Sequence, residues 1–175
     1  MELAGSAYLF NLSLVAMTFA AVSALVMLVR QTMGGKLSNF DIFLVTLYVA
    51  LGFAAGVNAI LPPLIALLHF SEAVTWVVAS LLAAAVQAMT VLHLQLQRPK
   101  AAAVALPLMA IVAYSVHWMA VVLFVANAVV PAFQGAALHA IAITMSLCMA
   151  MWTFVRRISL LLGEKPGEDW DPKRA

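Results

Sequence analysis

The sequence has very little charge. Only 9% of its 175 residues are Asp, Glu, Lys or Arg, and 66% are hydrophobic, whereas soluble domains carry roughly 25% charged residues. Residues 101–155 contain no charged residue at all. A membrane-spanning helix needs roughly 20 mostly apolar residues, so this run has room for two spans, separated by a break at Asn127, Pro131 and Gly135. We therefore expect an all-α, polytopic membrane helix bundle.

Several chemistries lack the residues that they need. The apolar segments hold no pair of carboxylates and no lysine, which excludes a retinal-type Schiff base and disfavours a carboxylate proton relay. There is no G-x-S-x-G, H-E-x-x-H, C-x-x-C or glycine-rich phosphate motif, so the sequence does not favour an enzyme. Cys148 is the single cysteine, which excludes a disulfide within the chain.

The remaining apolar runs predict a bundle of five spans within residues 1–162. The spans cover about residues 5–29, 40–60, 73–94, 101–127 and 132–157, and residues 163–175 form a polar cytoplasmic tail. With five spans, all nine basic residues fall on one side of the membrane: Arg30, Lys36, Arg98, Lys100, Arg156, Arg157, Lys165, Lys173 and Arg174. The positive-inside rule then places the N-terminus outside and the C-terminus in the cytoplasm of a bacterial-type inner membrane.

Two features of the second span predict how it packs and where it ends. Gly52 and Gly56 leave one face bare enough for another helix backbone to approach closely, either within the chain or in a dimer. Pro62 and Pro63 are expected to end the helix, since proline removes a helical hydrogen bond. The short apolar stretch 64–70, which contains His69, would then lie in the outer membrane interface or dip back into the membrane.

Polar residues inside the spans are the candidate site. His117 and His139 are predicted to lie at similar depth and to face each other or a shared cavity, counting 1.5 Å per residue from the break between their spans. Tyr114 shares a helical face with His117. Asn58 and Gln87 are further interior candidates, because an unpaired amide in hydrocarbon costs several kcal/mol.

The two histidines allow several interpretations. They can be neutral imidazoles hydrogen-bonded within the core, part of a pathway, or ligands of a haem b or a metal ion. Neighbouring helices pack about 8–10 Å apart, which leaves little room for a porphyrin between facing imidazoles. No cofactor is the expected state.

These observations favour a channel or transport-type membrane protein for a small solute or ion, working as an oligomer. The alternatives are a non-catalytic subunit or scaffold of a larger complex, and a redox membrane anchor that binds haem or quinone. The expected partners are the lipid bilayer, other copies or other membrane subunits, and a cytoplasmic protein for the tail. The basic residues are singles and pairs at the ends of apolar runs, which is typical of membrane anchors and not of nucleic-acid binding.

Overall fold

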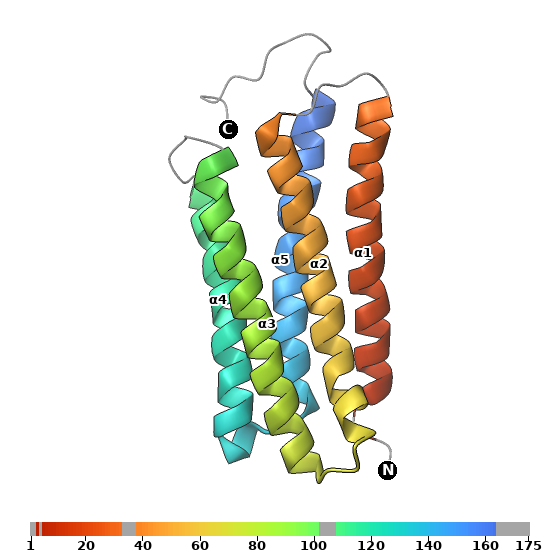
Figure 1. Cartoon of the computed structure of the whole chain (residues 1–175), viewed down its shortest axis with the longest axis vertical. Helices are drawn as coiled ribbons and strands as arrows, with labels where there is room; N and C mark the ends of the chain where they lie inside the picture. The colour runs from red at the N-terminus through yellow and green to blue at the C-terminus, as the bar shows by residue number, and fades with distance from the viewer. Residues whose placement is uncertain (1–2, 4, 33–37, 102–107, 164–175) are drawn as a thin grey trace.

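The described residues fold into five long helices that run alternately up and down (Figure 1). The computed structural model describes residues 3, 5–32, 38–101 and 108–163. Within them lie α1 (Ser6–Thr32), α2 (Asn39–Ala66), α3 (Glu72–Ala101), α4 (Leu108–Val129) and α5 (Ala136–Gly163), with a short 3-10 helix, η1 (Pro131–Phe133), between α4 and α5. No strand occurs in these ranges, so the predicted all-α class is confirmed.

Four of the helices surround a common interior, and the fifth packs outside them. Helices α2, α3, α4 and α5 each contact the next, and α5 returns to α2; α1 packs on α2 and, less extensively, on α5. Each of the five helices contains a segment long and apolar enough to cross a membrane. Large apolar side chains such as Leu14, Met89, Val122 and Trp152 are 58–66% exposed. Such an apolar exterior indicates a multi-pass membrane protein.

Basic residues gather at one end of the bundle. The final two turns of α1, α3 and α5 carry Arg30, Arg98, Lys100, Arg156 and Arg157, and we call this the basic end. Arg157 pairs with Asp41 at 3.2 Å and lies over the Phe40 ring, which joins the end of α5 to the beginning of α2. We call the opposite end, where α2 and α4 finish, the distal end.

The caps of two helices agree with the expected local chemistry. Ser38 and Asp41 form a capping box at the start of α2, in which each side chain accepts the other residue's backbone N–H. The Ser71 hydroxyl lies 3.4 Å from the Val74 backbone nitrogen at the start of α3. These bonds satisfy N–H groups that a helix leaves without an internal partner.

The prediction that Pro62 and Pro63 end the second helix is wrong. Helix α2 continues through both prolines to Ala66, and a turn with His69 at φ 59° leads to α3. Proline at position 62 leaves the carbonyl of Asn58 without its usual donor four residues later. The imidazole of His139 occupies that carbonyl instead, at 3.0 Å. Residues 64–66 are therefore the last turn of α2 and not a separate interfacial segment.

The other boundaries shift by a few residues. Helix α3 extends beyond residue 94 to Ala101, and α5 begins at Ala136 because η1 occupies Pro131–Phe133. The predicted start of the fourth span at residues 102–107 and most of the predicted tail, residues 164–175, lie outside the described residues.

The glycine face of α2 lies against α1 in the same chain. A Cβ atom added at Gly52 would lie 3.0 Å from the Ala20 Cβ and 3.1 Å from the Ala16 carbonyl oxygen. One added at Gly56 would lie 2.7 Å from the Met17 Cε. The Ser13 hydroxyl also donates to the Gly56 carbonyl at 3.1 Å. The two glycines therefore allow α1 and α2 to pack closely within one chain.

Candidate functional site

The interior of the four-helix group holds a set of polar side chains, which we call the polar core. None of its members is more than 3% exposed: Asn58, Ser80, Gln87, His117, Asn127, His139 and Ser146. They come from α2, α3, α4 and α5. A polar group buried in an apolar medium is costly unless it is hydrogen-bonded, so the bonds between these residues decide whether the core is stable.

His139 is the centre of the layer nearer the distal end. Its Nε2 lies 3.0 Å from the Asn58 carbonyl oxygen, and its Nδ1 lies 3.1 Å from the Ser80 hydroxyl. Because a carbonyl can only accept, Nε2 carries the proton and Nδ1 accepts from Ser80. The Asn127 amide donates to Ser80 at 2.8 Å and accepts the Gly135 backbone N–H at 3.2 Å. The layer is thus a directed chain of hydrogen bonds.

Two aromatic rings enclose this layer. The rings of Phe124 and Trp76 lie 5.0 and 5.8 Å from the His139 ring, centroid to centroid. Trp76 is 2% exposed and directs its indole N–H to Glu72 at 3.4 Å. His139 is therefore packed against two tilted aromatic rings and hydrogen-bonded at both ring nitrogens.

His117 is the centre of a second layer, nearer the basic end. Its Nδ1 lies 2.7 Å from the Ser146 hydroxyl and 3.2 Å from Nε2 of Gln87, which also donates to Ser146 at 3.0 Å. An amide NH₂ can only donate, so Nδ1 is the acceptor and Nε2 carries the proton. No hydrogen bond joins that Nε2–H to another described residue.

Asn58 connects the two layers. Its carbonyl accepts from His139, and its side-chain amide lies 3.5 Å from the Gln87 carbonyl oxygen. Its own Oδ1 is buried and has no partner among the described residues. An unsatisfied buried acceptor costs about 1–3 kcal/mol, so Asn58 is the weakest point of an otherwise well-bonded interior.

The prediction that the two histidines lie at similar depth is wrong. His117 bonds to Ser146, which follows His139 by seven residues on α5, about 10 Å along the helix at 1.5 Å per residue. The error comes from η1 and the residues around it: α5 begins at Ala136, so His139 is in its first turn. The histidines belong to one network, but they occupy different layers of it.

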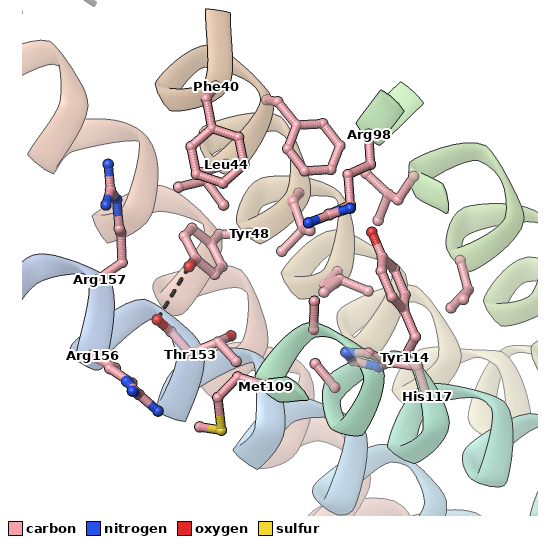
Figure 2. Close-up of a pocket in the computed structure, with 17 residues that line it drawn as sticks. Phe40, Leu44, Tyr48, Arg98, Met109, Tyr114, His117, Thr153, Arg156 and Arg157 are labelled. Carbon is pink, nitrogen blue, oxygen red and sulfur yellow. Dashed lines mark hydrogen bonds between the residues drawn. The ribbon is translucent and has the colours of Figure 1, made fainter. Parts of the chain in front are cut away.

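A cavity of about 190 Å³ lies at the basic end, next to the second layer. Its walls come from α2, α3, α4 and α5 and are mostly apolar: Phe40, Phe43, Leu44, Leu47, Leu51, Val91, Leu94, Met109, Ala110 and Ala113. Its polar lining residues are Tyr48, Arg98, Tyr114, His117, Thr153, Arg156 and Arg157 (Figure 2). Tyr114, predicted to group with His117, lines this cavity and is half-buried. His117 therefore belongs both to the polar core and to the cavity wall.

The arrangement offers little to a metal ion or haem. Both ring nitrogens of His139 and the Nδ1 of His117 are engaged in hydrogen bonds. In the part of the chain that the structure describes, no three His, Cys, Asp or Glu side chains are grouped to hold a metal ion. Binding between the two histidines would also have to span two layers of the core, so the geometry does not support that alternative.

Sequence reasoning missed two members of the polar core and the role of one arginine. Asn127 was assigned only to the break between spans, and Ser80 was assigned no role. Ser80 precedes Gln87 by seven residues, which places both on one face of a helix, and this spacing was the signal available. Arg98 was used only to predict the orientation of the bundle in the membrane, yet it lines the cavity.

The chain was compared with protein-family models, with curated proteins and with solved structures, and none of them matches it.

Proposed function

We propose that this protein is a passive, channel-like transporter of a small solute or ion in a bacterial-type inner membrane. Its N-terminus lies outside and its C-terminus in the cytoplasm. The orientation is supported by the basic end: the described basic residues of α1, α3 and α5 all lie there, and basic residues favour the cytoplasmic side.

The observation that carries the transport proposal is the length of the route that the polar core and the cavity together form along the bundle. On α3 the polar core begins at Ser80, and the cavity beyond it reaches Arg98, a separation of about 27 Å at 1.5 Å per residue. The hydrocarbon core of a bilayer is about 30 Å thick. Buried polar side chains inside membrane bundles commonly mark pathways, and the polar core together with the cavity extends along most of the membrane thickness.

The side chains suggest how such a route would work. In the present structure the polar core is closed, because its members bond to one another and Phe124 and Trp76 pack around His139. A polar solute entering from the cavity would replace these bonds one at a time, first at His117. The described spans hold no carboxylate within the polar core, so we infer facilitated movement down a gradient and not proton-driven uptake.

The same hydrogen bonds support a second candidate function, a non-catalytic membrane scaffold. Most polar groups of the core are satisfied by protein partners, as they would be if their only use were to hold helices together. The scaffold alternative predicts partners that co-purify in fixed ratio and a bilayer that remains impermeable.

Solute entry into proteoliposomes tests the proposal. Stopped-flow light scattering would follow glycerol, urea, formate, acetate and nitrate in liposomes with the protein, without it, and with Gln87→Leu. We expect faster entry of at least one of these solutes with the wild-type protein and a clear loss with Gln87→Leu, which removes the bonds to His117 and Ser146. If no solute enters faster than into empty liposomes, the transport proposal is wrong.

A further inference from the structure

Arg98 is a buried cation, and no described residue serves as its counterion. It is 9% exposed and lines the cavity at the basic end. No hydrogen bond or ion pair joins it to another described residue, whereas Arg157 pairs with Asp41. None of the described residues that line the cavity is acidic. A buried charge without a partner is strongly destabilising, so the position of Arg98 points to an anionic ligand.

The surroundings of Arg98 define the kind of anion. Figure 2 shows the Tyr114 hydroxyl directed toward the Arg98 guanidinium group, so both can donate to one ligand. The Tyr48 hydroxyl is already engaged with the Thr153 carbonyl at 3.2 Å. The rest of the wall is aliphatic and aromatic, including Leu94. The cavity therefore combines a buried guanidinium group, that of Arg98, with a large apolar surface, which suits a ligand with a charged head and an apolar body.

The volume limits the size of that body. The cavity measures about 190 Å³, and an engineered apolar cavity of about 150 Å³ holds one benzene molecule. A single aromatic ring or a short alkyl chain with a carboxylate therefore fits. The two acyl chains of a phospholipid exceed this volume.

We propose that this cavity binds a small monocarboxylate with an apolar body, its carboxylate paired with Arg98 and Tyr114. Guanidinium and carboxylate form two parallel N–H···O bonds, which are stronger than bonds between neutral groups. The apolar body lies between the aliphatic walls of α2 and α3. The inference rests on the proposed transport function in one respect only, that this anion is the solute which the polar core receives at His117.

Binding to the full-length protein in lipid nanodiscs tests the site without any measurement of flux. The probes are benzoate, its neutral isostere benzamide and its cationic analogue benzylamine, titrated calorimetrically with empty nanodiscs subtracted. We expect benzoate to bind about tenfold or more tightly than benzamide, the usual size of a charge-assisted hydrogen bond, and benzylamine not to bind. Equal affinities for benzoate and benzamide would overturn the proposal.

Three variants test whether Arg98 causes the preference for benzoate over benzamide. Arg98→Gln should reduce the ratio of benzoate to benzamide affinity to about one, and Arg98→Lys should retain part of it. Arg156→Gln is the matched control, because Arg156 also lines the cavity but is exposed; it should keep most of the preference. A preference that survives Arg98→Gln, or disappears equally in Arg156→Gln, contradicts the assignment to Arg98.

A fourth variant covers the case in which Arg98→Gln does not fold. Ala113 lines the cavity, so Ala113→Phe should fill it and abolish binding of benzoate and benzamide together. Benzoate binding that persists in Ala113→Phe would place the ligand elsewhere and overturn the site. Benzoate binding to the wild-type protein without benzoate flux would leave the site established and reject only its role in transport.

Discussion

The imidazole Nε2 of His139 lies 3.0 Å from the backbone carbonyl oxygen of Asn58. In a regular helix that carbonyl would accept the backbone N–H of residue 62, but Pro62 lies inside α2 and has no N–H. A side chain from α5 thus completes the hydrogen bonding of α2, and this bond also fixes the tautomer of His139. The proline and the histidine are two parts of one feature, although they lie far apart in the sequence.

This pairing predicts that His139 and Pro62 are coupled in stability. His139→Phe should lower the free energy of unfolding by about 1–3 kcal/mol, because the Asn58 carbonyl is left buried and unpaired. Pro62→Ala supplies a backbone N–H for that carbonyl, so His139→Phe should cost clearly less in the Pro62→Ala background. Unfolding of the four proteins by SDS in mixed micelles measures the coupling.

Pro63→Ala is the control for that cycle. Pro63 lies in the same helix. It removes the backbone N–H that would donate to the carbonyl of Ala59, and leaves that of Asn58 unaffected. Its effect should therefore add to that of His139→Phe. If the effects of Pro62→Ala and His139→Phe on the free energy of unfolding also simply add, the bond between His139 and Asn58 does not support α2.

The glycine face of α2 yields a prediction that separates its two members. Gly52→Ala should lower the free energy of unfolding by about 1–3 kcal/mol, the usual cost of overpacking, since its new Cβ meets the Ala16 carbonyl and the Ala20 Cβ. Gly56→Ala should change it by less than about 1 kcal/mol, because Met17 is flexible and alanine favours the helix. The same SDS titration compares them, and equal losses would show that α1 does not pack as described.

The class and the number of helices could be predicted because both follow from the length of the apolar runs. The glycine face and the interior position of Gln87 were also accessible, since helical periodicity places side chains on faces. The continuation of α2 through Pro62 could not be predicted. It depends on the side chain of His139, which lies 81 residues beyond Asn58, and local propensity contains no information about such a contact.

The candidate site was predictable in its composition but not in its layout. His117, His139, Asn58 and Gln87 are all buried, because polar groups within a span avoid lipid. Their layers depend on where α5 begins, and the 3-10 helix at Pro131–Phe133 shifted that start. Arg98 looked like an orientation signal at a helix end, and only the packing of four helices around it shows a buried cation.

Reporter fusions test the proposed orientation. A fusion after Arg157, or after the final residue, should be active only as a cytoplasmic reporter, because basic residues favour that side. A fusion within the turn at His69, between α2 and α3, is the matched control and should behave as a periplasmic reporter. A periplasm-active reporter after Arg157 would invert the bundle and place the cavity on the outer side.

Cysteine crosslinking tests the layers of the polar core. In a Cys148→Ala background, paired cysteines at 117 and 146 should react with a short bifunctional thiol reagent, because the His117 and Ser146 side chains are 2.7 Å apart. Cysteines at 80 and 139 should do the same, since those side chains lie 3.1 Å apart. Cysteines at 117 and 139 should react poorly, because their layers are separated by about 10 Å along α5.

The comparison between pairs makes this experiment decisive. Each protein would be tested in membranes before solubilisation, and the crosslink would be read as faster migration of the monomer in denaturing gels. His117 takes part in two of the three pairs, so a general loosening caused by its replacement would affect both pairs alike. Crosslinking of 117 with 139 that equals that of 117 with 146 would show that the histidines share one depth. The polar core would then form a single layer and not a route that leads toward the cavity, and the transport proposal would lose the observation that carries it.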